Sequence, residues 1–308
     1  MFENYIDQLL QNIPKQDSPY KLDIVFEGGS FNGLYGMGVL LFVQQMEKKG
    51  YITINRFSGA SVGALGCFKY LTNRMEDAVQ QYTLFKKSLR ENLNLNVLKD
   101  IVDQDIDNLD DELFQQIKKN KLFIAYHDVN KKKKTICNEY STKEELKQVL
   151  LKSCHFPYLV NGQCFLEDSS SCFFDGVLPY IFSEREQTSE SRILYISLSH
   201  LSKLKSIIFI KNENTIYGRV SEGILDAYQF FLRKKPTRFC SFVNQWHIGD
   251  FVYLRFKNLF FIVFCYIMEM SLKVGKKVQP LLIRSSLYNE MIPVFNEIYR
   301  DILLYSCF

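Results

Sequence analysis

The sequence predicts an α/β protein, in which a central and mostly parallel sheet is flanked by helices and followed by a mainly helical C-terminal part. Three observations point to this class. Short β-prone segments alternate with longer apolar segments of helical character between Leu22 and Leu71. Each passage from strand to helix coincides with a glycine-containing loop or turn. After residue 200, apolar residues recur mainly at helical spacing. Alternating strands and helices are typical of a parallel sheet with helices on its faces.

The first strand is expected at Leu22–Phe26, where a short run of β-prone residues stops at a Glu-Gly-Gly sequence. The apolar stretch Leu34–Lys49 follows and predicts a helix, which ends at Gly50 because glycine is the usual C-cap residue. A second strand, Tyr51–Phe57, runs through a sharp turn into a second helix, Val62–Leu71.

Residues 75–120 have apolar side chains at helical spacing, which predicts a helical excursion over the sheet that could form a lid. A later helix is expected to begin after Thr142, because Thr142 can cap it and Glu145 occupies the capping-box position. Further strands are expected at Leu122–Tyr126, Thr135–Tyr140, Cys172–Phe174 and Ile193–Leu198. The strongest later helices are expected at Glu222–Lys234 and Phe251–Leu272. We therefore expect a helical lead-in over residues 1–19, an α/β domain over 20–200, and a helical part over 201–308 packed on it.

The composition is that of an ordinary globular protein, with 308 residues, 47% apolar and 23% charged. A formal charge of +4 is too small to indicate a nucleic-acid partner, but it is compatible with an anionic lipid surface. The eight cysteines show neither a CxxC pair nor zinc-finger spacing, so we expect free thiols and no metal or other cofactor. The N-terminus lacks a basic region followed by an apolar stretch. A cytoplasmic protein is the expectation, with peripheral membrane contact as an open alternative.

Two segments raise the question of membrane contact. The four basic residues Lys131–Lys134 lie at an expected hairpin tip, where a solvated turn is favoured over contact with an anionic membrane. The most apolar run, Leu259–Met268, is too short to cross a bilayer. The wider region Phe251–Met270 also contains Arg255 and Lys257. For it, a buried helix is favoured over an interfacial segment.

A candidate nucleophile lies between the second strand and the second helix, in the sequence Gly59-Ala60-Ser61-Val62-Gly63. A serine hydroxyl is a poor nucleophile unless it is exposed and paired with a base. A tight strand-to-helix turn exposes it and requires small neighbours, as Gly59 and Gly63 are. The alternative is that Ser61 only caps the helix and that the glycines only allow the turn.

A glycine-rich loop, Gly28-Gly29-Ser30-Phe31-Asn32-Gly33, follows the first strand. Such a loop before a helix exposes several backbone N–H groups that can bind an anion. The loop lacks the lysine of a P-loop and the spacing of a dinucleotide-binding fingerprint, so by itself a structural turn is favoured.

A candidate base, Asp175, ends an apolar strand and precedes Gly176. Asp-Gly is a common turn sequence, so this feature alone also favours a turn. Asp168 is a weaker candidate, because no glycine follows it and no apolar strand precedes it.

Together, the glycine loop, the Gly-x-Ser-x-Gly turn and the distal Asp-Gly resemble the patatin-like phospholipase family, which has these motifs in the same order. The Pro-containing segment Ser153–Tyr158 also resembles the stretch that precedes the Asp-Gly of that family. The resemblance covers roughly residues 20–200. It implies a three-layer patatin-like fold and a lipid acyl hydrolase of phospholipase A or lysophospholipase type, with a Ser61–Asp175 dyad.

In the implied mechanism, Asp175 accepts the proton of Ser61, and Ser61 attacks a fatty-acyl ester such as a phospholipid. Neither a metal nor another cofactor is needed. Phe173 and Phe174 are suitable apolar neighbours to raise the basicity of Asp175. The oxyanion site implied by the resemblance comprises Gly28, Gly29, Ser30, Asn32 and Gly33.

Three positions depart from the family pattern. Ser30 stands where a third glycine is usual, Asn32 stands where a basic residue is usual, and Val177 stands where a second glycine is common. A serine with φ below zero could still present its N–H. These departures leave open a catalytically silent protein that binds lipid or a partner. A separate alternative is an esterase with a Ser-Asp-His triad, because Ser61, Asp175 and either His200 or His247 stand in that order.

Overall fold

A computed structural model of the protein describes residues 2–282 except 16–17, 169–170, 184–190, 204, 208 and 211–215. Beyond residue 282 it describes residues 290–291, 293–294, 297–298, 300–301 and 304–305. The chain divides into two compact units. The first consists of residues 1–208 and 213–245, and the second of residues 209–212 and 246–308.

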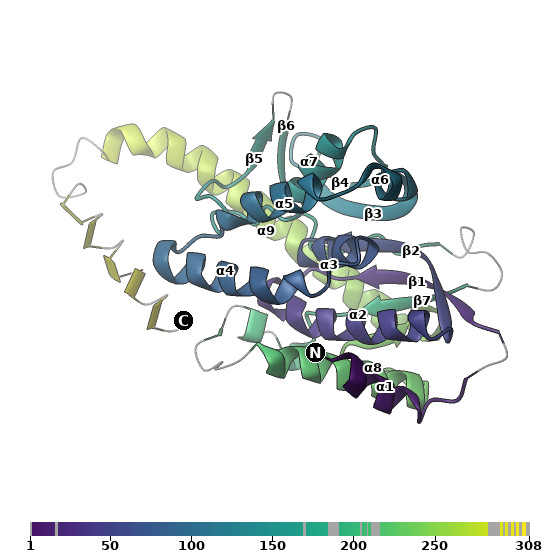
Figure 1. Ribbon diagram of the computed structural model, residues 1–308. Coiled ribbons are helices and arrows are strands. Elements are labelled where there is room, and N and C mark those ends of the chain that lie inside the picture. Colours follow the sequence, from purple (N-terminus) through teal and green to yellow (C-terminus); the bar gives the residue numbers. More distant parts are fainter. Residues whose placement is uncertain are drawn as a thin grey trace. The chain divides into compact units, whose positions relative to one another are not determined.

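The first unit is built on an eight-stranded sheet with the order β5-β6-β3-β2-β1-β7-β8, in which β4 also pairs with β3 (Figure 1). The strands are β1 Tyr20–Phe26, β2 Ile52–Ala60, β3 Lys119–Asp128, β4 Lys133–Glu139, β5 Leu166–Asp168, β6 Ser171–Asp175, β7 Ser191–Ile196 and β8 Cys240–Phe242. The four central strands β7, β1, β2 and β3 are parallel to one another. The pairings of β4, β6, β5 and β8 are antiparallel. The α/β class is confirmed, but the sheet is mixed rather than mostly parallel.

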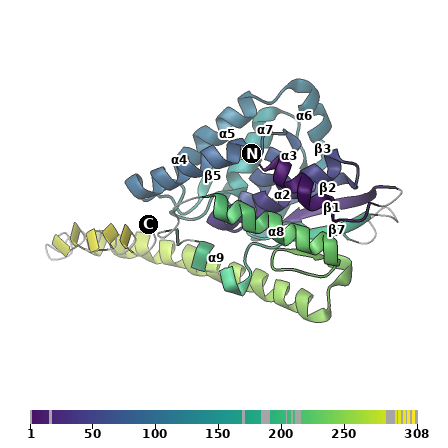
Figure 2. The same ribbon diagram turned by 60° about the horizontal axis from the view of Figure 1, so that its bottom comes forward.

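Helices flank this sheet (Figures 1 and 2). Their bounds are α1 Glu3–Leu10, α2 Gly33–Lys48, α3 Val62–Leu71, α4 Asp77–Asn92, α5 Val97–Asp107, α6 Asp111–Ile117, α7 Lys143–Ser153 and α8 Tyr217–Arg233. Short 3-10 turns are η1 Ser30–Asn32, η3 Leu201–Lys203, η4 Lys205–Ile207 and η5 Val243–Gln245. Helix α3 packs on the central strands β1, β2 and β3, while α7 packs on β3 and β6. The expected helical excursion over residues 75–120 is confirmed as α4, α5 and α6.

Two helix ends lie where the capping residues predicted them, namely the end of α2 and the start of α7. Gly50 follows α2 with φ of +73°, a conformation that glycine adopts without strain. The Thr142 hydroxyl accepts a hydrogen bond from the Glu145 N–H at the start of α7. The Glu145 carboxylate accepts the return bond from the N–H of Ser141, one residue before the position that a capping box uses.

The parallel strands bring the candidate motifs to one edge of the sheet. Phe26, the last residue of β1, pairs with Gly59 of β2, so the glycine loop and the serine turn both leave the sheet there. Ala60 pairs with Ala125 of β3. The next residue of β3, Tyr126, pairs with Asp175. The register therefore places Ser61 and Asp175 side by side, although 114 positions separate them in the chain.

The first unit extends beyond residue 200, where we expected the α/β domain to end. Helix α8 packs along α2. Strand β8 adds to the sheet through pairs such as Leu194 with Phe242. On α8, the buried positions include Val220, Ile224 and Ala227, which recur at the three- and four-residue spacing of one helix face.

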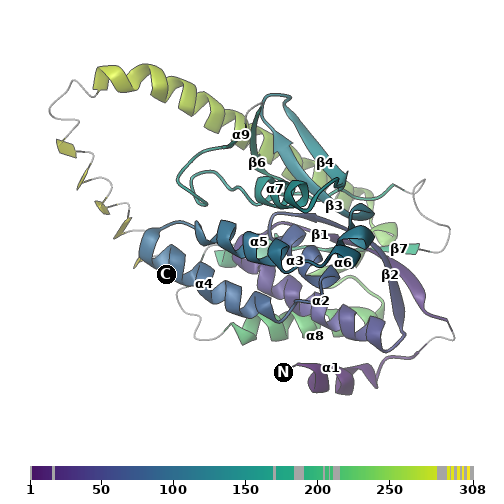
Figure 3. The ribbon, with the colours of Figure 1, turned by 45° about the horizontal axis from the view of Figure 1, so that its top comes forward.

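The second unit contains one long helix, α9 Ile248–Leu282 (Figure 3). The expectation of a buried helix at Phe251–Met270 stays a prediction. Within the structure, 6% of the most apolar window in Ile248–Ser271 is buried. This 24-residue segment is the candidate membrane span that the described residues contain. It is longer than the run that we had judged too short to cross a bilayer.

Candidate active site

Ser61 occupies a tight turn between β2 and α3, with φ of 53° and ψ of −132°. Positive φ is uncommon for a residue with a side chain and marks a strained turn. Glycine is required on both sides. A Cβ at Gly59 would lie 2.5 Å from Ala64 Cα, and a Cβ at Gly63 would lie 2.3 Å from the Phe26 carbonyl oxygen. The Ser61 side chain makes no capping bond to α3, which argues against the capping interpretation.

The Ser61 hydroxyl instead donates to Asp175. Its Oγ lies 2.5 Å from Asp175 Oδ2, so serine and carboxylate are in direct contact. The other carboxylate oxygen, Oδ1, accepts a hydrogen bond of 2.7 Å from the Val177 N–H. Both oxygens of Asp175 are therefore engaged, and one of them touches the hydroxyl that it would have to deprotonate.

Asp175 is 3% exposed, and this burial raises the pKa of its carboxyl group from 3.8 to about 6. The hydrogen bonds from Ser61 and Val177 act in the opposite direction, because they stabilise the ionised carboxylate. A carboxylate with this pKa is a stronger base than an ordinary aspartate and is still mostly ionised at neutral pH.

His127 lies behind Asp175, on β3. Its ring stacks on Phe174 at 5.0 Å, and its Nδ1 lies 3.2 Å from the Asp175 carbonyl oxygen. Burial lowers the pKa of His127 from 6.5 to about 4, so the imidazole is neutral at physiological pH. It therefore places no positive charge beside the carboxylate.

Ser153, at the end of α7, supports the serine turn and was not among the residues that we predicted. Its hydroxyl accepts a hydrogen bond of 2.9 Å from the Ser61 N–H and donates one of 2.7 Å to the Ala125 carbonyl oxygen. The Ser153 carbonyl oxygen accepts from the Gly176 N–H at 3.2 Å. Ser153 thus contacts both halves of the candidate dyad. Its place at the start of the Pro-containing segment was the signal that could have revealed it.

Gly28 lies directly against the nucleophile. A Cβ at Gly28 would be 3.1 Å from Ser61 Cβ and 2.9 Å from the Val177 carbonyl oxygen, so only glycine fits. The Gly28 N–H donates to the same Val177 oxygen at 3.1 Å. In this conformation it is engaged and cannot also serve an oxyanion. Val177 itself has φ of 47°.

Two other N–H groups of the predicted oxyanion loop are also engaged. The Asn32 N–H donates to the Gly29 carbonyl oxygen, and the Gly33 N–H donates to that of Ser30. Within the described residues, the N–H groups of Gly29 and Ser30 donate no hydrogen bond. Ser30 has φ of 47°, so it does not keep the negative φ that we had considered. Of the five residues predicted for the oxyanion site, those whose N–H groups can still serve as donors are therefore Gly29 and Ser30.

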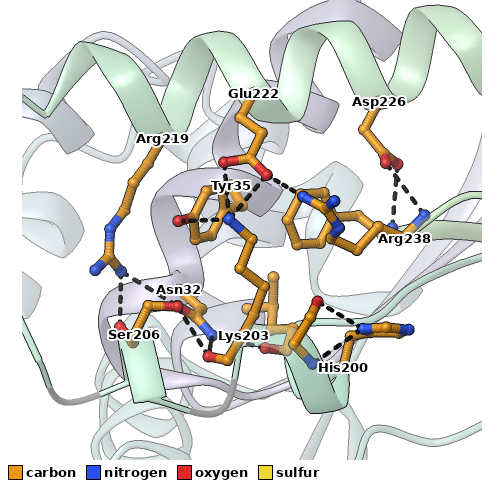
Figure 4. Close-up of polar contacts among 12 residues, drawn as sticks. Asn32, Tyr35, His200, Lys203, Ser206, Arg219, Glu222, Asp226 and Arg238 are labelled. Carbon is orange, nitrogen blue, oxygen red and sulfur yellow. Dashed lines mark hydrogen bonds and ion pairs between the residues drawn. The ribbon is translucent and has the colours of Figure 1, made fainter.

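Asn32 anchors the loop instead of facing the serine. Its buried carboxamide donates to the carbonyl oxygens of Leu198 at 2.8 Å and Lys203 at 2.9 Å. Its Oδ1 accepts a hydrogen bond of 3.2 Å from the Arg219 guanidinium (Figure 4). With its backbone N–H also engaged, Asn32 has no remaining donor for an oxyanion.

Arg219 reaches the loop from α8 and was also missed by sequence reasoning. It is 4% exposed and donates to the Ser206 carbonyl oxygen at 2.9 Å as well as to Asn32. The loop itself contains no basic residue. The guanidinium of Arg219 brings positive charge from α8 to the Asn32 side chain. Because α8 lies far along the chain, no local motif could have shown this.

The carboxylates of Glu27 and Glu222 fix the segments that surround the glycine loop. Glu27, 1% exposed, accepts hydrogen bonds from the N–H groups of Leu198 and Ser199, which fixes the segment after β7. On the other side of the loop, Lys203 donates to Glu222 of α8 at 2.8 Å and to the Tyr35 hydroxyl of α2 at 3.1 Å (Figure 4). The loop is therefore held between α2, α8 and the segment that follows β7.

No hydrogen bond within the described residues joins Ser61 to the alternative partners considered for it. His200 is exposed, and its Nδ1 contacts the Ser202 hydroxyl at 2.9 Å. His247 belongs to the second unit. Asp168 pairs with Lys152 at 3.1 Å. Throughout the described parts of the chain, no group of three or more His, Cys, Asp and Glu residues is arranged to hold a metal ion.

The fold and the site thus define an α/β protein with a Ser–Asp pair at a strand-to-helix turn, in which the aspartate is buried and the serine is partly exposed. No protein-family model matches the chain, and a search of curated proteins finds no match.

Proposed function

We propose that the protein is a serine-dependent acyl hydrolase that acts on lipids, of phospholipase A or lysophospholipase type. The observation that carries the proposal is the contact of 2.5 Å between Ser61 Oγ and Asp175 Oδ2 at a strained turn. A serine becomes a useful nucleophile when an adjacent base accepts its proton. The order and chemistry of the three motifs, which resemble those of patatin-like phospholipases, support the same conclusion.

In the proposed reaction, Asp175 accepts the Ser61 proton while Oγ attacks the acyl carbonyl carbon. The negative charge that develops on the carbonyl oxygen is stabilised by the N–H groups of Gly29 and Ser30. One such donor is typically worth about 2.7–4 kcal/mol of the barrier. Protonated Asp175 then gives its proton to the leaving alkoxide as the ester bond breaks. Water, deprotonated by Asp175, attacks the acyl-enzyme, and Ser61 recovers its proton from Asp175 as the fatty acid leaves.

The acid–base properties of Asp175 suit both halves of this cycle. A pKa of about 6 leaves the carboxylate ionised before attack, yet basic enough to hold the serine proton transiently. Direct contact with Asp175 also leaves no place for a histidine between the two groups. This favours a dyad over a Ser-Asp-His triad.

A fatty-acyl substrate is supported by apolar side chains around the site. Phe31, within the glycine loop, packs edge-on against Tyr82 of α4 at 5.6 Å. Phe156 and Tyr158 are both exposed and lie in the segment whose His155 carbonyl oxygen accepts the Asp175 N–H. Phe31 and Tyr82 are buried, so the exposed rings of Phe156 and Tyr158 are the ones that offer apolar surface for an acyl chain.

A fluorophosphonate probe together with acyl-ester hydrolysis tests the proposal. We expect the wild type to be labelled and Ser61→Ala to be unlabelled. Asp175→Asn should lose turnover, whereas the matched controls His200→Ala and His247→Ala should retain it. Phospholipid, lysophospholipid and a short-chain soluble ester should be compared as substrates. Absence of both labelling and hydrolysis in the wild type would refute the enzymatic proposal.

A catalytically silent lipid-binding protein is the second candidate, and one observation favours it. The Gly28 N–H, expected in the oxyanion site, already donates to the Val177 carbonyl oxygen. If this bond persists with substrate bound, Gly29 and Ser30 are the two of the five expected oxyanion-site residues that still offer a backbone donor. Lipid binding without labelling of Ser61 would support this candidate.

A further inference from the structure

Glu27 is a buried carboxylate that takes no part in the proposed proton transfers. It lies between Phe26, the last residue of β1, and Gly28, the first residue of the glycine loop. Glu27 is 1% exposed, and its backbone N–H donates to the Ile196 carbonyl oxygen at 3.0 Å. A carboxylate is costly to bury unless it is hydrogen-bonded, so the partners of Glu27 indicate what it does.

Four hydrogen bonds reach the Glu27 carboxylate from three consecutive residues that follow β7. Oε2 accepts from the Ser197 hydroxyl at 2.8 Å and from the N–H groups of Leu198 at 2.9 Å and Ser199 at 3.2 Å. Oε1 accepts from the Ser199 hydroxyl at 2.8 Å. Two of these four donors belong to the main chain. Glu27 therefore fixes the backbone of segment 197–199 and not only its side chains.

Leu198, in the middle of this segment, lies against the glycine loop at two points. A Cβ at Gly29 would be 2.5 Å from Leu198 Cβ, so the Gly29 main chain is in close contact with that side chain. The Leu198 carbonyl oxygen accepts a hydrogen bond of 2.8 Å from the Asn32 carboxamide. Leu198 is fully buried, and a close-packed interior transmits displacements. A shift of the Leu198 backbone would therefore move the glycine loop with it.

We propose that Glu27 is a positioning residue for the reaction proposed above. Its hydrogen bonds hold Leu198 against Gly29, and this contact keeps the Gly29 N–H in the place from which it stabilises the oxyanion. The inference rests on the proposed function, because an oxyanion forms only when Ser61 attacks an acyl carbonyl. A donor stabilises an oxyanion fully only within a narrow range of distance and direction, so displacement of segment 197–199 lowers kcat. In this role Glu27 acts through Leu198 and transfers no proton.

Three substitutions of Glu27 test the inference, with kcat and KM measured on a short-chain soluble ester. Glu27→Met removes every acceptor at similar side-chain length, so kcat should fall by about tenfold or more while KM changes little. Glu27→Asp keeps the charge but withdraws the carboxylate by one methylene, and its kcat should fall less. Glu27→Gln should keep kcat within about threefold of the wild type. Its amide oxygen can accept the bonds that reach Oε2, and its NH₂ group can donate to the Ser199 hydroxyl.

Asp23→Leu is the matched control. Asp23 is a second buried carboxylate of β1, and it accepts hydrogen bonds of 3.1 Å from the side chains of Asn55 and Arg56 on β2 and one of 3.5 Å from Ser191 at the start of β7. Asp23→Leu and Glu27→Met should both lower the thermal stability, because each leaves buried donors without an acceptor. The kcat of Asp23→Leu should equal that of the wild type, since these bonds lead away from the glycine loop.

Amide hydrogen exchange provides a readout that needs no turnover. The Asn32 N–H donates to the Gly29 carbonyl oxygen at 3.0 Å, so its exchange reports on the glycine loop and not on the bonds of Glu27 itself. Glu27→Met should speed exchange at Asn32 by more than its loss of global stability explains. Asp23→Leu should not.

Several outcomes would overturn the inference. These are a wild-type kcat in Glu27→Met, an equal fall of kcat in Asp23→Leu, and a Glu27→Gln variant as impaired as Glu27→Met, which would assign the effect to charge instead of hydrogen bonding. If circular dichroism shows that Glu27→Met does not fold, wild-type kcat and Asn32 exchange in Glu27→Asp overturn the inference instead. A wild type without ester hydrolysis rejects the proposed function. The exchange at Asn32 then decides by itself whether Glu27 controls the loop.

Discussion

The Ser153 hydroxyl accepts a hydrogen bond of 2.9 Å from the backbone N–H of Ser61 and donates one of 2.7 Å to the Ala125 carbonyl oxygen. This bond ties the strained turn to α7 and β3. The serine turn therefore depends on a neighbouring side chain as well as on its glycines.

Ser153→Ala should lower kcat while changing KM little, because it frees the Ser61 backbone to leave its strained conformation. It should also destabilise the fold by about 1–3 kcal/mol, the usual cost of leaving a buried polar group unsatisfied. Urea unfolding and steady-state kinetics measure both effects. The control is Ser88→Ala, on α4. It removes the hydrogen bond from the Ser88 hydroxyl to the Asn94 carbonyl oxygen and should leave kcat unchanged.

The activity should increase with pH through about 6, because only ionised Asp175 can accept the serine proton and its pKa is raised to that value. A profile of kcat/KM against pH measures this. A midpoint near 4 would mean that burial does not raise the pKa of the Asp175 carboxyl group. Activity that follows a group near 7 and is lost in a histidine variant would point to a triad.

The same pKa has a consequence for stability. Between pH 3.8 and about 6, native Asp175 holds a proton that the unfolded chain has lost. The free energy of unfolding must therefore fall as pH rises through this range, by about 3 kcal/mol in total from this group. Asp175→Asn should lack this part of the slope and should be more stable than the wild type at pH 7. Chemical denaturation at pH 4 and pH 7 tests the difference.

Arg219→Met should reduce kcat by about tenfold, because the buried carboxamide of Asn32 loses a charged donor and the glycine loop loses an anchor. Arg219→Lys should recover part of the loss, since it keeps the charge but not the geometry. Arg233→Met, at an exposed position of the same helix, is the control. If Arg219→Met keeps the wild-type kcat and only loses stability, the contact between Arg219 and Asn32 stabilises the fold and does not contribute to catalysis.

Val177→Gly should stabilise the protein slightly, by about 1 kcal/mol. The branched side chain now adopts φ of 47°, which costs roughly 1–2 kcal/mol, and the added freedom of glycine in the unfolded chain offsets part of the gain. Thermal unfolding measures the change. A loss of stability would show that packing of the Val177 side chain outweighs its backbone strain.

The ion pair between Lys69 of α3 and Asp105 of α5 is almost completely buried, with 2.5 Å between Nζ and Oδ1. Lys69→Met should cost about 3–5 kcal/mol, because it leaves a buried carboxylate without its main partner. The double variant Lys69→Met/Asp105→Leu should recover most of this loss. Denaturant unfolding of the wild type, Lys69→Met, Asp105→Leu and the double variant gives the coupling energy. Equal losses in Lys69→Met and the double variant would contradict the prediction.

The elements near the site were predictable because their signals are local. Apolar runs located β1 and β2, glycines located the turns, and Thr142 located the start of α7. The direction of a strand within a sheet has no such signal, because an apolar run is compatible with parallel and antiparallel pairing alike. The antiparallel pairing of β6 with β3 was therefore missed. Ser61 and Asp175 were paired through the resemblance of the three motifs, in their order, to those of patatin-like phospholipases. Arg219 could not be assigned to Asn32, because 187 positions separate them and only the packing of α8 on α2 brings them together.

The donors left for the oxyanion, the N–H groups of Gly29 and Ser30, belong to the main chain. Replacing side chains one at a time by alanine would leave the Ser30 donor in place, and at Gly29 it would add an atom 2.5 Å from Leu198 Cβ rather than remove one. Alanine scanning would therefore show little loss of activity at Ser30. At Gly29 it would show a loss that comes from the steric clash and not from the missing donor. Exchanging single amides for esters in a semisynthetic chain would delete the donor itself and reveal its contribution to the reaction.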